Sequence, residues 1–437
     1  MAHRARLRSL AVLLPLVSVS AETTDAPLVV RTRRMDLPDN LLDVAPPDAT
    51  VWLRRGDGMI AWGEVARFSV TGPSRFADAA RAWQLLAEGA VVRDEVGTNG
   101  TGPVAFGSFA FADDGESVLV VPEVVVGRRG GVGWVTTMSR GGRVPAATVP
   151  VRQSDPPSPG DVRLRAGALS EEEWCVAVED AVGRIAAGEL EKVVLARDVV
   201  AHTDTALDVR WPLAHFAEHY PGCWTFHVDG LLGATPEMLV RLDNGLATSR
   251  VLAGTIRRTG DDEHDLALAG SLARSSKDLE EHELAVRSVA DALARHGTLN
   301  VPESPFVLHL PNVMHLATDV TGVVHDGRNA LELVADLHPS AAVCGTPTAK
   351  AKVAITELER MDRGRYAGPV GWMDADGDGE WAIALRCAQV DGDTTLRLFA
   401  GCGVVAGSTP ADELAEADAK LTPVRDALAG TYRRVSV

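Results

Sequence analysis

Cysteine is scarce in this chain of 437 residues, and its five cysteines include no C-x-x-C pair. An odd number without paired spacing predicts neither a disulfide framework nor a zinc site, and it favours a reducing compartment. Hydrophobic residues make up 46% of the chain and charged residues 24%. These shares are typical of a globular enzyme, and they exclude a collagen, a coiled coil or a disordered tail.

Positive charge is also in short supply. Lysine and arginine total 43 against 60 for aspartate and glutamate, which gives a formal net charge of −17. A surface this acidic repels nucleic acid and anionic lipid, so we expect neither as a partner. An anionic substrate would need local positive charge or a metal ion in its site.

Long apolar runs are absent except near the N-terminus, where residues 1–21 have the shape of a secretory signal peptide. Its apolar run, 10–19, is too short to span a bilayer. The alternative is a start codon assigned too far upstream, with Met35 as a possible internal start, although residues 29–34 could belong to a first strand. We expect residues 1–34 to be an N-terminal extension.

The next part of the chain, 35–160, is rich in short strand-like runs separated by Gly, Asp and Pro, as in antiparallel hairpins. A helix is expected over 75–90, and the proline-rich segment 154–161 reads as a linker. The strand-like runs are 51–54, 59–70, 104–111, 117–126 and 132–138.

A second helix is clearly marked at its start by Ser170 and Glu173, which form a capping box, and Gly188 ends it. A buried strand is expected over 193–200. Strands and helices then alternate irregularly, which favours a mixed α+β architecture over a regular βαβ array.

Lys192 is the first residue of chemical interest. Strand alternation places it on one face with Val194 and Ala196. A lysine among apolar residues is either a solvent-edge residue that discourages aggregation or a desolvated amine, and a desolvated amine can act as a base. This fragment alone leaves both interpretations open.

Two further helices carry acidic groups on one face. Asp278 and Glu281 lie three residues apart near the start of a helix that runs to about 295, where carboxylates also complement the helix dipole. Glu413, Glu416 and Lys420 form a single stripe on the last helix, 410–428, which could equally be a solvated face. If the two acidic pairs meet, they could bind a hard cation such as Mg²⁺.

Two other motifs are excluded. Residues 374–379 resemble the start of an EF-hand, but Leu385 stands where the loop needs a bidentate glutamate, so the segment reads as a hairpin turn. The glycines of 401–403 lack the lysine of a phosphate-binding loop, so nucleotide binding is unsupported.

Taken together, these fragments resemble the chorismate-utilising enzymes, and most closely the isochorismate synthases. The resemblance covers about 165–430, in family order. It is carried by EKVVLAR (191–197), GATPE (233–237), LAGT (252–255), SKDLEEH (276–282), LHPS (337–340), RGRYAG (363–368), GEW (379–381), LRC (385–387), FAGCG (399–403) and EADAK (416–420).

The resemblance implies a single large α+β fold with two stacked antiparallel sheets flanked by helices and a site in the cleft between them. The linker at 154–161 would then be a surface loop. We expect 35–160 to form the strand-rich N-terminal part and 161–437 the chorismate-binding catalytic region.

Isochorismate synthases add water to C2 of chorismate while the C4 hydroxyl leaves, and the reaction needs a base and an acid. The resemblance places the base on Lys192 and the general acid on Glu237. Each such group is typically worth about 10²–10⁴ in rate.

The resemblance also implies a Mg²⁺ cofactor, which would neutralise the dianionic substrate. Its ligands would be Glu281 and Glu416, with Asp278 and Glu413 as nearby carboxylates. The implied substrate-binding residues are Gly254, Thr255, His338, Tyr366, Arg386, Gly401, Cys402, Gly403 and Lys420.

Single positions sort the subfamilies. Anthranilate synthases resemble this chain but lack the lysine at 192, and aminodeoxychorismate synthases carry a nucleophilic lysine where this chain has Ala253. Salicylate synthases share both features, so salicylate formation with loss of pyruvate is the alternative. Ser340, Cys344 and Cys402 depart from the usual family residues, and we expect them to tune activity without abolishing it.

A non-catalytic chorismate-binding protein is disfavoured because the implied acid, base and metal ligands are all present. Water as nucleophile removes the need for a glutaminase subunit. Chorismate is a cytosolic metabolite, so we expect a cytoplasmic enzyme that serves menaquinone or siderophore biosynthesis, and we favour a misassigned start over secretion.

Overall fold

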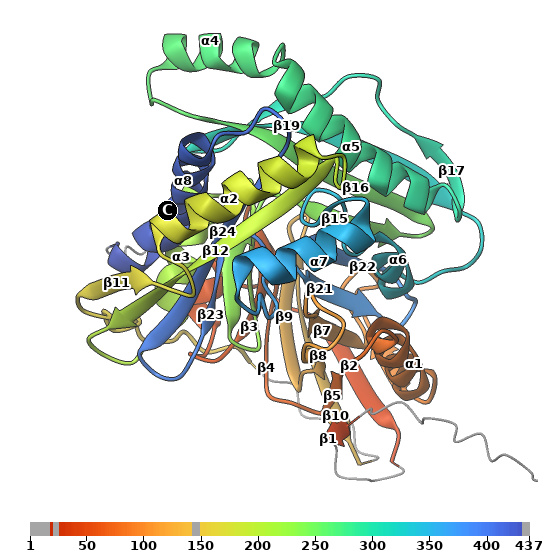
Figure 1. Ribbon diagram of the computed structural model, residues 1–437. Helices are drawn as coiled ribbons and strands as arrows, with labels where there is room; N and C mark the ends of the chain where they lie inside the picture. Colours follow the sequence, from red (N-terminus) through yellow and green to blue (C-terminus); the bar gives the residue numbers. More distant parts are fainter. Residues whose placement is uncertain (1–17, 21–25, 142–148, 431–437) are drawn as a thin grey trace, which may run out of the picture.

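The computed structural model describes residues 18–20, 26–141 and 149–430, which fold into two large sheets covered by helices (Figure 1). Most of the expected extension, 1–34, lies outside these residues. Its last part, however, forms strand β2 (Leu28–Arg34), which pairs with β10 (Val132–Arg140) inside the larger sheet.

One sheet has eleven strands within the described residues, and its paired strands run antiparallel. In spatial order they are β1 (Ser18–Ser20), β5 (Ala66–Val70), β8 (Ser117–Val121), β7 (Val104–Ser108), β21 (Pro369–Asp374), β22 (Gly379–Ile383), β15 (Met238–Asp243), β16 (Leu246–Arg257), β19 (Val313–Val324) and β17 (Gly297–Asn300), with β18 (Phe306–His309) also on β19.

The other sheet has thirteen described strands and is antiparallel except where β2 meets β6. Its order is β11 (Val162–Ala166), β12 (Lys192–Thr203), β24 (Thr395–Val404), β23 (Cys387–Val390), β14 (Leu231–Thr235), β13 (Trp224–Val228), β3 (Thr50–Arg54), β4 (Asp57–Trp62), β9 (Val124–Arg129), β10, β2 and β6 (Val91–Asp94), with β20 (Gly345–Thr346) also on β12.

The helices cover these sheets. Helices α2 and α7 pack on β12, α8 packs on β24, and α5 packs on β16 and β19. The described helices are α1 (Arg75–Glu88), α2 (Glu171–Ala186), α3 (Arg210–His219), α4 (Asp262–Leu272), α5 (Ser276–Leu293), α6 (Ala330–Leu337), α7 (Thr348–Glu359) and α8 (Pro410–Ala429), with a short 3-10 turn at Leu41–Val44.

The two sheets are joined by one continuous hydrophobic core that contains residues of both. Polar contacts also cross between them: Trp52 of β3 donates its indole N–H to Glu380 of β22 at 2.9 Å, and the Arg129 guanidinium of β9 lies over the Trp372 ring of β21. The expected α+β fold with two stacked sheets is therefore confirmed. Burial of apolar surface in this core is the main source of its stability.

Helix signals in the sequence correspond closely to the structure. The Ser170–Glu173 capping box is present at the start of α2, and the helices expected near 276 and 410 begin at those residues. The hairpin expected around 374–379 is also present, as β21 and β22. The segment 154–161 contains neither helix nor strand, and β11 begins directly after it.

Two expected strand runs are each divided between the sheets. The run 59–70 contains the end of β4 and all of β5, which belong to different sheets, and the chain changes direction at Gly63, where φ is +70°. The run 117–126 is divided in the same way at Pro122, which has no N–H to donate to a ladder. Hydrophobic alternation cannot show this change of sheet, because it continues on both sides of the turn.

No helix in the described part of the chain is both long enough and apolar enough to cross a membrane.

Candidate active site

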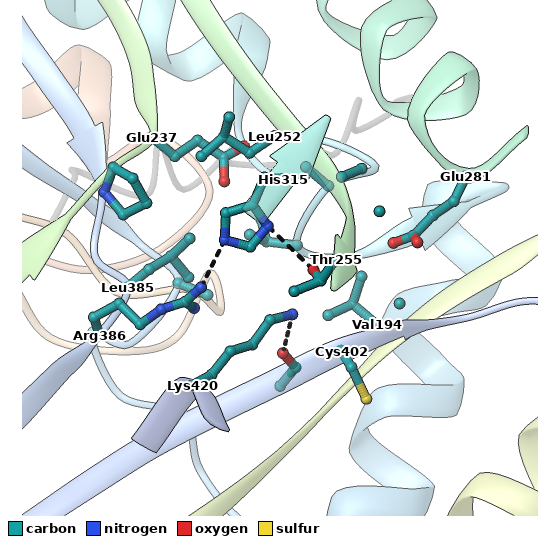
Figure 2. A pocket seen from close by; sticks show the side chains of 18 of the residues that line it. Val194, Glu237, Leu252, Thr255, Glu281, His315, Leu385, Arg386, Cys402 and Lys420 are labelled. Carbon is teal, nitrogen blue, oxygen red and sulfur yellow. Dashed lines mark hydrogen bonds between the residues drawn. The ribbon is translucent and has the colours of Figure 1, made fainter. Parts of the chain in front are cut away.

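A pocket lies where β12 and β24 of the larger sheet approach β16 and β19 of the smaller one (Figure 2). Its lining includes ten of the residues implicated by sequence, contributed by strands, loops and helices far apart in the chain. These ten are Glu237, Gly254, Thr255, Glu281, Tyr366, Arg386, Gly401, Cys402, Gly403 and Lys420.

Glu237 follows β14 and is only 4% exposed. Burial raises the pKa of its carboxyl group to about 7, even though the Leu252 backbone N–H and the charge of Lys192 act in the opposite direction. Desolvation of the carboxylate therefore outweighs its favourable contacts. At neutral pH a large fraction of Glu237 carries a proton, as a general acid requires.

Lys192 is fully buried at the start of β12, which rules out the solvent-edge interpretation of this residue. Its Nζ lies 3.1 Å from Oε1 of Glu281 on α5. Gly403 of β24 leaves the space for this pair: a Cβ at that position would lie 2.0 Å from Glu281 Oε1 and 3.0 Å from Lys192 Cε. Glycine is required there because of this close approach.

Of the stripe on α8, Lys420 lines the pocket, whereas Glu413 and Glu416 lie outside its lining. Lys420 Nζ donates to Glu416 Oε1 at 2.5 Å and to the Gly401 carbonyl oxygen at 2.9 Å, and the Lys420 side chain is 12% exposed. The ion pair between Glu416 and Lys420, which a solvated helix face would also form, is therefore partly buried here. The second contact of Lys420, with Gly401, joins α8 to β24.

Glu413, one turn earlier on α8, is 2% exposed and pairs with Lys277 of α5 at 3.0 Å. Asp278 accepts a hydrogen bond from the backbone N–H of Thr255. If Gly254 carried a Cβ, that atom would lie 2.9 Å from the Cβ of Asp278. Gly254 has φ +74° at an irregularity in the pairing of β16 with β19. The strand irregularity thus allows α5 to approach β16 closely.

The four acidic residues influence one another. Burial raises the pKa of Glu416, and the charges of Glu413 and Glu281 raise it further; burial and Glu281 likewise raise the pKa of Asp278. Such mutual repulsion favours a bound cation. Over 18–20, 26–141 and 149–430, no three acidic, histidine or cysteine side chains are already grouped as metal ligands. One or two carboxylates plus substrate and water oxygens are, however, sufficient for a hard divalent ion.

His315 of β19 also lines the pocket, and the sequence analysis missed it. Arg386 Nη2 lies 3.0 Å from His315 Nε2, and His315 Nδ1 lies 3.1 Å from Thr255 Oγ1. Because a guanidinium only donates hydrogen bonds, Nε2 accepts and the ring proton is on Nδ1. Burial, then the Arg386 charge, lowers the pKa of His315 well below its usual value, so the ring is neutral. A single histidine within an apolar run gave no signal of this role.

His338 does not line the pocket, so the substrate contact expected for it has no support. Its ring contacts Phe76 and Phe111 edge-on, and its Nε2 is 3.1 Å from the Phe111 carbonyl oxygen. Burial lowers its pKa to about 3. His338 is half-buried at the C-terminal end of α6, and the substrate contact expected for it stays a prediction.

The remaining expected contacts come from rigid parts of the fold. Tyr366 is 4% exposed and stacks on Phe399 with ring centroids 5.1 Å apart, and burial raises the pKa of its hydroxyl. Arg386 is 7% exposed, and burial lowers the pKa of its guanidinium. Arg386 and Lys420 therefore give this side of the pocket two cationic groups, which suit an anionic ligand.

Comparison with known proteins gives a consistent result. Residues 143–429 match the family model described as "Chorismate binding enzyme". Isochorismate synthase DhbC of Bacillus subtilis is 42% identical over 262 residues, which are 57% of this chain and 66% of that protein. That stretch is slightly less than two thirds of the relative's length.

Other similarities extend over most of the chain. The salicylate biosynthesis isochorismate synthase of Pseudomonas aeruginosa is 32% identical over 406 residues, 86% of this chain and 84% of that protein. A second similarity is to the crystal structure of a candidate 2,3-dihydroxybenzoate-specific isochorismate synthase, DhbC from Bacillus anthracis. The two structures superpose with a TM-score of 0.74 at 32% sequence identity, and the superposition covers 89% of this chain and 98% of that one. This chain therefore belongs to the chorismate-binding enzyme family.

Proposed function

We propose that this protein is an isochorismate synthase, which converts chorismate to isochorismate by adding water at C2 and releasing the C4 hydroxyl. The single observation that carries the proposal is Glu237, a buried carboxyl with a pKa of about 7 that shares the pocket with Arg386 and Lys420 and is close enough to Lys192 for the charge of that residue to act on it. A partly protonated acid near cations matches a reaction in which a dianion must lose a poor leaving group.

Lys192 is the proposed base. The Lys192 side chain must first lose the proton it carries in its ion pair with Glu281, and the free amine then removes a proton from the attacking water, whose oxygen bonds to C2 as the ring double bonds shift. Glu237 gives its proton to the C4 oxygen, which leaves as water. One water enters and one leaves, so the two groups return to their starting states by exchanging one proton with solvent.

Arg386 and Lys420 are the proposed partners of the substrate carboxylates, since both are partly or fully buried cations on one wall of the pocket. Thr255 and His315 form a fixed hydrogen-bonded pair beside Arg386 and would orient the ring. Tyr366 and the backbone of 401–403 complete the proposed contacts.

We further propose that Mg²⁺ binds at Glu281 and Glu416, with Asp278 and Glu413 nearby. Hard carboxylate oxygens suit this ion. Burial and, to a smaller degree, the neighbouring carboxylates raise the pKa of Glu416 and of Asp278, and a cation would relieve that repulsion. The ion would neutralise substrate charge in the site.

Water is the proposed nucleophile, so the reaction needs no ammonia-supplying glutaminase subunit. Because chorismate is a cytosolic metabolite, we propose that the enzyme acts in the cytoplasm. The relatives named above point to siderophore or related aromatic pathways, and menaquinone synthesis is a further candidate.

Incubation of the purified protein with chorismate and Mg²⁺, followed by chromatographic analysis of products, tests the proposal. Isochorismate as the sole product supports it. Salicylate with pyruvate would instead establish a salicylate synthase, and absence of turnover with measurable chorismate binding would establish a binding protein.

A further inference from the structure

Strand β12, which begins with Lys192, has an incomplete edge. On one side it pairs with β24 from 193 to 202. On the other side β20 pairs with residues 192–193 and β11 with residues 199–203, so within the described residues no strand pairs with 194–198 there. Unpaired backbone groups inside a protein are costly, so this gap must be satisfied in another way.

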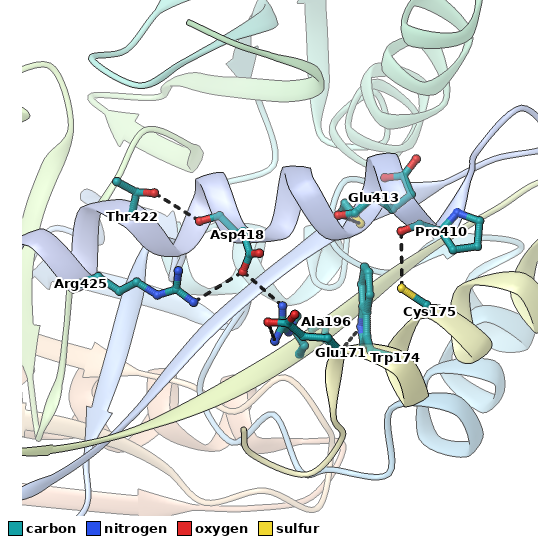
Figure 3. Close-up of polar contacts among 11 residues, drawn as sticks. Glu171, Trp174, Cys175, Ala196, Pro410, Glu413, Asp418, Thr422 and Arg425 are labelled. Atoms are coloured by element: carbon teal, nitrogen blue, oxygen red, sulfur yellow. Dashed lines mark hydrogen bonds and ion pairs between the residues drawn. The ribbon is translucent and has the colours of Figure 1, made fainter. Parts of the chain in front are cut away.

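Two backbone contacts fill part of this gap, from the Val194 N–H to the Cys344 carbonyl oxygen and from the Gly167 N–H to the Asp198 carbonyl oxygen. Side chains fill the rest, and Figure 3 shows one of them. Arg363 Nη2 donates to the Val194 carbonyl oxygen at 2.8 Å, and Glu359 Oε1 accepts the Ala196 N–H at 2.7 Å. The indole of Trp174 donates to the Ala196 carbonyl oxygen at 3.1 Å. Donors and acceptors alternate along the edge as they do in a strand ladder.

Arg363 and Glu359 are themselves a buried ion pair, 3% and 1% exposed. They are joined by two hydrogen bonds of 2.9 and 2.5 Å, and Arg363 Nη1 donates to the Val343 carbonyl oxygen at 2.8 Å. A buried pair of this kind is weak evidence for stability, because apolar residues of similar size often replace it without loss. Its backbone contacts are what an apolar pair could not reproduce.

These contacts surround the pocket. Val194 and Val343, the two residues whose carbonyl groups Arg363 binds, both line it, and Arg363 lines it as well. Val194 is two residues from Lys192 on the same face of β12. Residues 192–193 are held by β20 and the Val194 N–H by the Cys344 carbonyl oxygen, and the ion pair fixes the following part of the same strand, 194–196.

We propose that Arg363 and Glu359 are positioning residues that replace a missing strand on the edge of β12 and thereby hold the Lys192 amine at its place beside the pocket. This inference rests on the proposed function only for the role of Lys192 as base. The contacts of Arg363 and Glu359 with the backbone of β12, called the clamp below, do not depend on that role.

The test uses the double variant Glu359→Leu, Arg363→Met, which removes both clamp contacts without leaving an unpaired charge, and the single variant Arg363→Lys as a milder form. We expect faster amide hydrogen exchange in the peptide spanning 193–198, by about tenfold or more, and faster acetylation of Lys192, both measured by mass spectrometry. We expect kcat to fall about 10–100-fold while KM for chorismate changes little, since misplacement of a catalytic group costs rate.

The matched control is Arg210 with Asp208, a buried arginine–aspartate pair that also binds backbone, through the Ser154 carbonyl oxygen at 3.0 Å. The variant Asp208→Leu, Arg210→Met should leave kcat and the exchange of 193–198 unchanged.

Unchanged exchange and acetylation in the clamp variants would overturn the proposal, as would faster exchange with unchanged kcat in an active enzyme. If the wild type makes no isochorismate, the proposed function fails by itself. Exchange and Lys192 acetylation then still decide whether the pair holds β12 and its lysine.

Discussion

Two carboxyl groups in different regions of this protein have nearly the same acidity. Glu237 beside the pocket and Asp374 in the hairpin between β21 and β22 are 4% and 7% exposed, and burial raises the pKa of each to about 7. Acidity alone would make both candidates for catalysis. Their surroundings separate them.

Asp374 is held by its own turn. Its Oδ1 accepts the backbone N–H groups of Asp376 and Asp378 at 3.0 and 3.1 Å, and the charges of the same two residues raise its pKa further. It does not line the pocket. Its environment is therefore that of a structural turn residue.

Glu237 has the opposite surroundings. The charges of Lys192, Arg386 and Lys420 all lower its pKa, yet burial still dominates. The comparison shows that a shifted pKa marks a buried charge, whereas a cavity and opposite charges identify the group that can take part in a reaction.

The largest difference is expected in turnover. Glu237→Gln should lower kcat for isochorismate formation about 10²–10⁴-fold because the proton donor is lost. Asp374→Asn should leave kcat within about threefold, since the amide oxygen can still accept the turn hydrogen bonds. Steady-state kinetics of the two purified variants measures this, and equal losses would show that the distinction is wrong.

Glycines in the two regions sharpen the comparison. Gly403→Ala should lower kcat about 10–100-fold, because its Cβ would displace Glu281 and Lys192. Gly377→Ala in the Asp374 turn, at φ +88°, should lower the melting temperature but not kcat of the folded protein. Thermal melts alongside kinetics separate the two effects, and a normal rate in Gly403→Ala would contradict the close packing described for the pair.

Of the two carboxyl groups, only Glu237 should influence the pH dependence of the rate. A proton donor with a pKa of about 7 is protonated below that pH and loses its proton above it. We therefore expect kcat/KM to fall above pH 7, by at most about tenfold per pH unit because deprotonation of the base Lys192 acts in the opposite direction. Asp374→Asn should keep this alkaline limb, whereas the residual activity of Glu237→Gln should lack it. A rate that stays flat to pH 9 in the wild type would argue against Glu237 as the acid.

Stability is where the two groups should behave alike. In the unfolded chain these carboxyls lose their protons near pH 4, but in the folded protein they do so only near pH 7, so stability falls as the pH rises between those values. Glu237→Gln and Asp374→Asn should each stabilise the protein at pH 8, by at most about 3 and about 4 kcal/mol respectively, and have little effect at pH 4. Urea unfolding at both pH values measures this, and a variant that is less stable than wild type at pH 8 would contradict it.

Much of the fold was predictable because its signals are local. The capping box of α2 and the first turns of α5 and α8 depend on residues within four positions of each other. The assignment of strands to sheets was not predictable, because β4 and β5 are separated by a tight turn at Gly63 whose two sides have the same alternation.

The site was predictable only through resemblance, and mainly where a residue lies within a motif. Glu237, Glu281 and Lys420 are such cases, and all three line the pocket. His315 escaped notice because a lone histidine in a strand is more often a core residue. His338 was expected at the substrate through its match to a family histidine; at the end of α6 its ring contacts Phe111 and it does not line this pocket, so that contact stays a prediction.

The lysines that accompany the acidic residues have a consequence for folding. Glu281, Glu413 and Glu416 each contact an ammonium group, from Lys192, Lys277 and Lys420 respectively. In small metal-dependent domains the apoprotein unfolds because nothing else balances the ligand charges. Here the counter-ions are built into the chain, so a chelator should abolish turnover and lower the melting temperature only slightly, without unfolding the protein.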